Sequence, residues 1–236
     1  MKKDDEALIR QLAAKPPEEI LRCAADYFGS GSIAFASSLG AEDQVITDII
    51  HREGLDIPVF TLDTGRLPEE TYELLSAVRN RYGASIELLF PERIDVESMV
   101  TAYGPNLFYE SIEKRKECCR IRKVEPLRRK LSSLKAWVCG LRREQSVTRT
   151  GVAPLEWDDA FALYKINPLA DVTEAWVWEY IRTNSVPYNA LHDRGYPSIG
   201  CAPCSRAILP GEDVRAGRWW WEQAVHRECG LHGEKR

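Results

Sequence analysis

The stretch Ile33–Asp43 reads IAFASSLGAED and joins three patterns that decide the fold. An apolar run typical of a buried strand leads through a loop of small residues into a helix, whose apolar periodicity continues to His51. The order recurs further along, where a predicted strand at Ile57–Leu62 precedes a predicted helix at Pro68–Tyr82. Strands alternating with helices indicate an α/β fold, with a mostly parallel twisted sheet and helices on both faces.

Apolar runs and helical periodicity predict further elements of both kinds. Strands are expected at 85–90, at 136–141 and within 161–168. Helices are expected at 4–28 (broken at Pro16-Pro17), at 124–134, from a cap at Asp171 or Thr173 to about 183, and at 218–229. The last part, from about residue 187, is otherwise loop-rich and predicts an irregular C-terminal extension.

The 236-residue chain is 44% hydrophobic and 29% charged, as in an ordinary globular domain. Its net charge of −4 gives no global basic field that would indicate nucleic acid. No apolar run reaches membrane-spanning length, and no secretory signal is apparent, so we expect a cytoplasmic protein. Lys114–Lys130 and Arg142–Arg149 are strongly basic, which suggests a confined anionic ligand; a solvated charged face is the alternative.

The loop Ser37–Asp43 is a candidate anion site, because ligands of open parallel sheets bind beyond the carboxyl ends of strands. Its backbone N–H groups, the positive helix end and two serine hydroxyls suit a phosphate or sulfate. Leu62–Arg66 (LDTGR) follows the second strand at an equivalent place. The default interpretation of such turns is a helix cap without a ligand, and the P-loop and dinucleotide patterns are missing.

Cys118-Cys119 and Cys201-Ala-Pro-Cys204 form two close pairs of thiols. A thioredoxin-like redox pair usually opens a helix after an early strand, whereas Cys201 and Cys204 stand late in a loop region. A zinc ribbon favours two Cys-x-x-Cys knuckles at short separation. Inert buried thiols explain single cysteines better than this arrangement. A four-iron cluster with one cysteine on each iron is modestly favoured over zinc by the spacing.

Cys229 stands near the end of the chain beside a glycine, in the sequence ECGLH. Terminal segments move unless they are docked, so this thiol could reach a site and then a partner. Basic neighbours at His226, Arg227 and His232 would favour its nucleophilic thiolate. An unimportant tail thiol is an equally weighted alternative. Cys23 and Cys139 have apolar neighbours and are assigned to the core.

Taken together, these motifs resemble the assimilatory sulfonucleotide reductases, and in particular the bacterial adenylyl-sulfate reductases that take electrons from thioredoxin. The resemblance covers roughly residues 30–233. It rests on motifs in one order: SSLGAEDQV, TLDTGRLPEETY, ECCRIRKVEPL, GLRREQSVTR, KINPL, YPSIGCAPCSR, GRWWWE and ECGLH. The loop after the first strand also resembles a degraded pyrophosphate loop of the adenine-nucleotide hydrolase-like superfamily, Ser-Gly-Gly-x-Asp-Ser. Here the doubled glycine is absent, which disfavours ATP splitting.

The resemblance implies one sulfonucleotide reductase domain over 1–236, with a catalytic tail at about 222–236 and an adenine nucleotide alpha hydrolase-like fold. It implies a [4Fe–4S] cluster on Cys118, Cys119, Cys201 and Cys204, and Cys229 as the nucleophile. The implied substrate-binding residues are Ser37, Ser38, Gly40, Asp43, Leu62, Asp63, Thr64, Gly65, Lys123, Arg142, Arg149, Arg215 and Arg218. Lys123 is expected between the cluster and the sulfate.

The implied activity is reduction of adenosine 5′-phosphosulfate (APS) to sulfite and AMP in sulfate assimilation toward cysteine, with thioredoxin as the electron donor. Related reductases that need the 3′-phosphorylated nucleotide generally lack both cysteine pairs, so their presence points to APS. We expect no nucleic-acid or membrane partner, and the protein could form a homo-oligomer. Two rival hypotheses are an iron–sulfur tRNA-thiolating enzyme on the same fold and a zinc-stabilised binding module without catalysis.

Overall fold

A computed structural model describes residues 12, 15–145 and 151–223, and the chain divides into two compact units. Unit 1 comprises Met1–Thr61, Glu73–Glu87 and Ser133–Asn189. Unit 2 comprises Leu62–Tyr72, Leu88–Ser132 and Ala190–Arg236. Each unit is therefore assembled from segments that lie far apart in the sequence.

The sheet has six strands in the order β3-β2-β1-β4-β6-β5, most of them in unit 1. The pairs β1–β2, β1–β4 and β4–β6 are parallel, and β5 runs antiparallel to β6 at the edge. The register sets Phe35 beside Val59 on one side and Val138 on the other. The strands are β1 (Ile33–Ala36), β2 (Val59–Leu62), β3 (Glu87–Leu89), β4 (Ala136–Val138), β5 (Leu155–Asp158) and β6 (Leu163–Ile166). The predicted mostly parallel sheet is confirmed.

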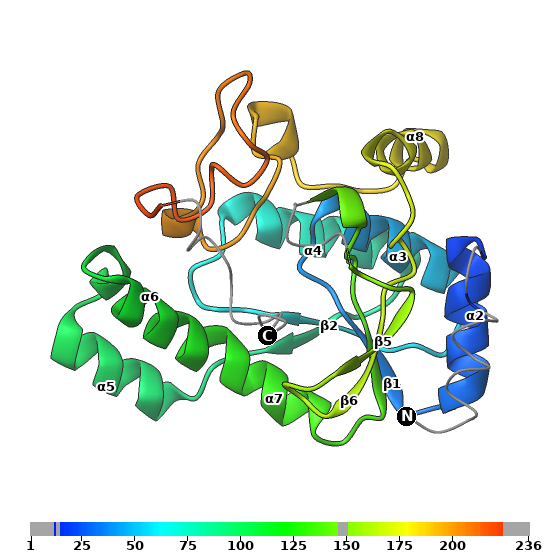
Figure 1. Ribbon diagram of the computed structural model, residues 1–236, viewed down its shortest axis with the longest axis horizontal. Coiled ribbons are helices and arrows are strands. Elements are labelled where there is room, and N and C mark those ends of the chain that lie inside the picture. The colour runs from blue at the N-terminus through cyan, green and yellow to red at the C-terminus, as the bar shows by residue number, and fades with distance from the viewer. Residues whose placement is uncertain (1–11, 13–14, 146–150, 224–236) are drawn as a thin grey trace. The chain divides into compact units, whose positions relative to one another are not determined.

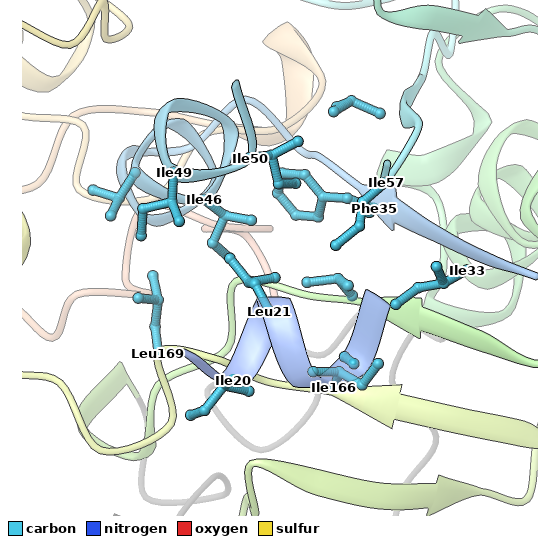
Figure 2. Close-up of a cluster of buried hydrophobic side chains, with 14 of the residues drawn as sticks. Ile20, Leu21, Ile33, Phe35, Ile46, Ile49, Ile50, Ile57, Ile166 and Leu169 are labelled. Atoms are coloured by element: carbon cyan, nitrogen blue, oxygen red, sulfur yellow. The ribbon is translucent and has the colours of Figure 1, made fainter. Parts of the chain in front are cut away.

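The main core of unit 1 lies between its helices and this sheet (Figures 1 and 2). The helices are α2 (Pro17–Phe28), α3 (Ala41–Arg52), most of α4 (Glu69–Tyr82) and α8 (Glu174–Asn184). Figure 2 shows Leu21 of α2 and Ile46 of α3 beside Phe35 of β1 and Ile166 of β6. Burying one such side chain contributes about 1.5–3 kcal/mol, so this apolar contact fixes the strand ends from which the loops leave.

Unit 2 contains mainly helices and irregular segments, with α5 to α7 shown in green in Figure 1. Its elements are α5 (Arg93–Tyr103), η1 (Leu107–Tyr109), α6 (Ile112–Cys119), a π-helical segment η2 (Arg120–Val124), α7 (Glu125–Leu131), η5 (His192–Arg194) and η6 (Ala202–Cys204). π-Helical turns are rare and often accompany functional sites. This one directly follows the Cys118-Cys119 pair.

Most predicted elements are confirmed with boundaries shifted by a few residues. Thr173 caps α8, because its hydroxyl accepts a hydrogen bond from the Trp176 N–H at 3.2 Å. β5, α5 and α6 had no counterpart among the predicted elements. The helix predicted at 218–229 is wrong for the described part, 218–223, which forms turns. Trp219 there has a φ of +43°, which no right-handed helix accepts.

Within the described ranges, no helix combines the length and the apolar character needed to cross a bilayer.

Candidate functional site

The loop after β1 delivers the chain to the start of α3 without a side-chain cap. Gly40 is the N-cap residue, with φ −74° and ψ 170°, and as a glycine it offers no side chain to accept a hydrogen bond from the first turn. The first N–H groups of a helix have no acceptor within the helix, and the helix dipole adds positive potential. This end of α3 is therefore suited to the oxygens of a phosphate or sulfate.

Leu39 gives this loop a turn that a glycine would normally make. Its φ is +62°, in the left-handed region that bulky residues avoid. Its side chain is buried against Leu74 and Val78 of α4. A strained residue of this kind costs about 1–3 kcal/mol and persists only where its surroundings fix it. The loop therefore keeps a left-handed turn even though it lacks the doubled glycine of the related pyrophosphate loops.

The two carboxylates in the first turn of α3 accept hydrogen bonds from the protein itself. Asp43 Oδ2 accepts the Ser38 N–H at 2.5 Å and the Ser38 hydroxyl at 2.7 Å. Burial raises the pKa of Asp43 to about 6; the Ser38 hydrogen bonds and the Gly140 N–H oppose this rise, and the charge of Glu42 adds to it. Glu42 Oε1 accepts from Arg142 Nε at 2.9 Å. The positive helix end thus remains the attractive feature for an anion.

The predicted anion residues of unit 1 lie together at this end of α3. Ser37 is buried and its Oγ accepts the Leu39 N–H, whereas Ser38 is exposed. Arg142, predicted to bind substrate, is buried and paired with Glu42. Arg149 and Cys229 lie outside the described residues.

In unit 2, the loop Leu62–Arg66 contacts the segment that carries Cys201 and Cys204. Asp63 Oδ1 accepts the Gly65 N–H at 2.8 Å and the Tyr72 hydroxyl at 3.0 Å. Thr64 is buried, and its Oγ1 lies 3.2 Å from Cys201 Sγ within hydrogen-bond reach. Ala202 N donates to Arg66 O at 2.8 Å. The predicted loop and the Cys201–Cys204 turn therefore form one hydrogen-bonded structure.

All four paired cysteines gather in one buried cluster of unit 2, as the sequence predicted. Cys118 and Cys119 end α6, Cys201 precedes the short η6 turn, and Cys204 ends it. They pack with apolar side chains that include Phe108 and Trp219. Their exposed fractions are only 6–9%. Residues more than eighty positions apart in the sequence are thus brought together, away from solvent.

These thiols are crowded and surrounded by cations. Burial and the neighbouring Cys201 raise the pKa of Cys204 to about 12, while Lys123 and Arg218 oppose the rise. Burial likewise raises the pKa of Cys118, against the charges of Arg122 and Lys123. Such thiols ionise readily only beside a strong positive centre, as a metal provides. The cations around them would balance the negative charge of a thiolate-ligated cluster.

The donors around the thiols fit an iron–sulfur cluster. Three buried N–H donors, on Arg122 Nε, Arg218 Nε and Trp219 Nε1, lack an acceptor in the described chain. Buried donors are nearly always satisfied, so an acceptor bound among the thiols would suit these three; Gln44 and Trp137 of unit 1 also have buried polar atoms without a partner. Cluster sulfides are acceptors of this kind, since hydrogen bonds to the sulfurs tune such clusters.

A single zinc ion fits the same residues less well. It would need four sulfurs about 2.3 Å from one point. Over the described ranges, no three Cys, His, Asp or Glu side chains are placed to hold one metal ion. In a four-iron cluster each cysteine binds a different iron, so the sulfurs need not converge on one atom.

The remaining predicted cations of unit 2 are Lys123, Arg215 and Arg218. Lys123 acts electrostatically on both Cys118 and Cys204, and its place between the cluster and the sulfate stays a prediction. Arg218 is buried against Gly200, where a Cβ would come within 2.2 Å of its Nη2. Arg215 is partly exposed in the turn before it. Lys123 and Arg218 thus place positive charge beside the thiols of unit 2.

The remaining described cysteines belong to unit 1. Cys139 is buried, and burial raises its thiol pKa well above the usual value. Cys23 is partly buried and packs against the main core. Both core assignments are confirmed. No disulfide joins any of the six cysteines that the structure describes.

Two features of unit 2 had no signal in the sequence. The buried ion pair of Arg115 and Glu222 joins residues 107 positions apart, with hydrogen bonds of 2.9 and 2.8 Å. Arg122 belongs to a basic run, and nothing in the sequence shows that its side chain is buried. Arg122 lies in the π-helical segment that directly follows Cys119. It is buried there, and its Nη1 donates a hydrogen bond to Thr64 O at 2.6 Å.

Residues 32–207 match the family described as the phosphoadenosine phosphosulfate reductase domain. An adenosine 5′-phosphosulfate reductase of Allochromatium vinosum is 59% identical over 201 residues, 85% of this chain and 78% of that protein. A protein of the same name from Pseudomonas aeruginosa is 48% identical over 232 residues, 96% of this chain and 85% of that protein.

Among solved structures, a phosphoadenylyl-sulfate reductase from Candida auris in a phosphate complex has a TM-score of 0.75 and 26% identity. The similarity covers 88% of this chain and 98% of that one. An FMN adenylyltransferase of Candida glabrata, 16% identical with a TM-score of 0.58, covers 94% of this chain and 77% of its own. The second likeness concerns the fold alone.

Proposed function

Because the chain belongs to the phosphoadenosine phosphosulfate reductase domain family, we propose that it reduces adenosine 5′-phosphosulfate to sulfite and AMP. In this proposal thioredoxin is the electron donor, Cys229 is the nucleophile, and Cys118, Cys119, Cys201 and Cys204 hold a [4Fe–4S] cluster. The reaction is an oxidoreduction at sulfur and would serve sulfate assimilation toward cysteine.

The observation that carries the proposal is the buried group of four cysteines with three N–H donors that lack acceptors. A chain that only bound a nucleotide would have no use for this arrangement. The relatives at 48–59% identity, whose names state APS reduction, supply the substrate. The uncapped start of α3 supports the same choice, because it suits the anionic end of that substrate.

The proposed chemistry consists of two exchanges at sulfur. The Cys229 thiolate attacks the sulfate sulfur, the bond to the phosphate oxygen breaks, and AMP leaves with the electron pair. A thioredoxin thiolate then attacks Cys229 Sγ, and sulfite leaves from the S-sulfocysteine. The second thioredoxin thiol resolves the mixed disulfide and restores the Cys229 thiol, so the two electrons come from thioredoxin.

The chain's cations address the main obstacle to the first exchange. A thiolate that approaches an anionic sulfate is repelled, so the sulfate oxygens must be neutralised. We assign this role to Lys123, Arg215 and Arg218, and the binding of phosphate to the loop with Ser37, Ser38 and Gly40. When bound, the cluster would supply fixed charge and sulfide acceptors for the three N–H donors.

The decisive experiment uses anaerobically purified protein with APS and no thioredoxin. The peptide that carries Cys229 should gain one SO₃ unit in the mass spectrum, and added thioredoxin should release it as sulfite. A label on Cys201 or Cys204 would show that another thiol attacks. The Cys229→Ser variant is the matched control: it should take no label and release no sulfite, yet keep its iron.

The substrate branch is tested by comparing APS with its 3′-phosphorylated relative under the same conditions. We expect APS to be preferred, because related reductases that need the 3′-phosphate generally lack both cysteine pairs. A higher kcat/KM with the 3′-phosphorylated nucleotide would move the protein to the other branch.

A further inference from the structure

The loops that follow β1 and β4 leave the sheet side by side in unit 1. The parallel register places Phe35 next to Val138, one residue before β1 ends and at the last residue of β4. The β1 loop continues into α3, and the β4 loop continues through Gly140 to Arg142. Residues of the two loops are therefore within reach of one another at the carboxyl edge.

Asp43 connects these loops through its carboxylate. Oδ2 holds Ser38 through its N–H and its hydroxyl, at 2.5 and 2.7 Å. The carboxylate also accepts the backbone N–H of Gly140. Only 6% of Asp43 is exposed, so a carboxylate used in this way has little capacity left for a ligand.

Gly140 is required here by close approach. A Cβ on residue 140 would lie 2.0 Å from Asp43 Oδ1 and 3.2 Å from its Cγ. Real Cβ contacts are never that short, so any other side chain would push the carboxylate away. The glycine thus allows the β4 backbone to come within hydrogen-bond distance of Asp43.

Glu42 and Arg142 add a second connection between the same loops. Arg142 Nε donates to Glu42 Oε1 at 2.9 Å, with the arginine side chain only 4% exposed. The adjacent pair neutralises the carboxylate that would otherwise face an anion at the start of α3. Between these two connections, the strained Leu39 turn is held in one conformation.

We propose that Asp43 and Gly140 form a latch between the β1 and β4 loops, and that both are positioning residues for the anion-binding loop. Asp43 then acts by holding Ser38 and Leu39, so that the free N–H groups of α3 meet the substrate's anionic group. The proposal rests on the proposed function for the identity of that substrate. It replaces the expectation that Asp43 itself touches the substrate.

The test uses Asp43→Asn and Gly140→Ala in the full-length holoenzyme. An asparagine amide has one acceptor oxygen in place of two and carries no charge, so it cannot hold the three donors of the latch as the carboxylate does. With APS and thioredoxin, we expect KM to rise about tenfold while kcat changes less than about threefold, as for a lost positioning contact. The double variant should match the more affected single one, because both break the same latch.

Asp48→Asn is the matched control. Asp48 is an equally buried carboxylate on α3, but it accepts hydroxyls of Tyr82 and Tyr180 at 2.9 and 2.8 Å, away from the loop. It should leave KM for APS unchanged. If Asp48→Asn raises KM as much as Asp43→Asn does, the effect is general loosening of α3, and the latch is refuted.

Amide hydrogen exchange tests the latch without using activity. Peptides covering 36–44 and 138–142 should both exchange about tenfold faster in Asp43→Asn, and neither should change in Asp48→Asn. A raised KM with unchanged exchange in both peptides would mean that Asp43 touches the substrate, which overturns the positioning role. Should Gly140→Ala fail to fold, Asp43→Asn and the control still decide.

The two proposals can fail separately. If the wild-type protein releases no sulfite from APS, the proposed function falls. Exchange in the two peptides, together with the affinity for AMP measured by calorimetry, then still shows whether Asp43 holds the loop. Unchanged exchange and unchanged AMP affinity in Asp43→Asn would refute the latch in either case.

Discussion

The two candidate regions bury polar groups to a similar depth but satisfy them differently. In unit 1, the Asp43 carboxylate accepts from Ser38 and Gly140, and Asp48 accepts from two tyrosines. In unit 2, three buried N–H donors beside four thiols have no acceptor among the described residues. The Asp43 carboxylate is therefore satisfied by the protein itself, although its neighbour Gln44 has both side-chain polar atoms buried without a partner, whereas the donors beside the cysteines of unit 2 await a bound acceptor.

The contrast indicates which region depends on a cofactor for its stability. A satisfied hydrogen-bond network fixes a conformation by itself, whereas each unsatisfied buried donor costs about 1–3 kcal/mol. The thiols add to this, because burial and mutual repulsion keep Cys204 from ionising without a cation. Unit 2 should thus gain most of its order when the cluster binds, and unit 1 should hardly respond.

The largest effect is expected for Cys201→Ser. The variant should lose most of the roughly four irons per chain expected for one cluster, and sulfite release should fall at least a hundredfold. Exchange should rise in the peptides of α6 and of 196–206, while those of β1 and β4 stay protected. Iron analysis and exchange mass spectrometry measure both changes.

Cys23→Ser is the control, because this thiol packs against the core of unit 1 and lies outside the cluster. It should retain its iron and its exchange pattern. If Cys201→Ser keeps a full complement of iron, or loosens β1 and β4 as much as α6, the two units do not differ in the way proposed here. Zinc in place of iron in the wild type would contradict the cluster outright.

The second effect concerns the buried ion pair that unit 2 does satisfy internally. Glu222→Ala leaves Arg115 buried without its partner, with 1% of the arginine side chain exposed. Breaking such a pair from one side costs about 3–5 kcal/mol. Glu97→Ala removes the carboxylate of an exposed pair with Arg93 and should cost less than about 1 kcal/mol.

Urea unfolding followed by tryptophan fluorescence measures both changes, since the Arg115 guanidinium lies 4.7 Å from the Trp219 ring centroid. Equal losses in the two variants would mean that burial does not set the strength of these pairs. A loss of iron in Glu222→Ala, on top of the loss of stability, would show that the pair also supports the cysteine group.

The sequence also predicts the two regions to different extents. The strand–loop–helix of 33–52 is local, so apolar period and small residues were enough to predict β1 and α3. The cysteine group was predictable as two pairs, because cysteine is rare and its spacing is informative. Its donors were not predictable: Arg122 and Trp219 belong to a basic run and a tryptophan run, and only tertiary packing turns their N–H groups inward.

The latch shows the other limit of sequence reasoning. Asp43 at the start of a helix beside a candidate anion loop predicts a ligand contact, and the residue type cannot show that its carboxylate already accepts from Ser38 and Gly140. Gly140 carries no signal at all, since its glycine is required by an approach between two loops and not by a turn. Such constraints exist only once the strands are paired.

The third effect is a pH dependence of stability that belongs to unit 1. Burial raises the pKa of Asp43 from 3.8 to about 6 in the folded state. Between these values the unfolded chain loses the proton while the folded chain keeps it, so the free energy of unfolding falls as pH rises from 4 to 6 and then levels off. Two pKa units correspond to a change on the order of 3 kcal/mol.

Asp43→Asn removes this dependence, so the stability of the wild type relative to the variant should decline from pH 4.5 to 6. Urea midpoints at several pH values measure the slope, which is independent of the hydrogen bonds that the variant also loses. A difference between the two proteins that stays constant over this range would show that Asp43 is ionised in the folded protein throughout.

The smallest effect tests whether unit 1 is as well satisfied as its hydrogen bonds suggest. Tyr82→Phe and Tyr180→Phe each remove one hydroxyl that donates to Asp48. Each should lower the free energy of unfolding by about 1 kcal/mol, since the carboxylate loses one donor and keeps the other. Removing both leaves a buried carboxylate with Arg52 as its nearest described cation at 3.9 Å. The double variant should therefore lose more stability than the sum of the single ones, because the second removal leaves the buried carboxylate without either donor.

Iron content and KM for APS should not change in any of the three variants, since these contacts lie within unit 1 and away from the loop. A merely additive loss would mean that Asp48 finds another partner when the tyrosines retreat, and unit 1 would then owe its order to apolar packing more than to its polar network.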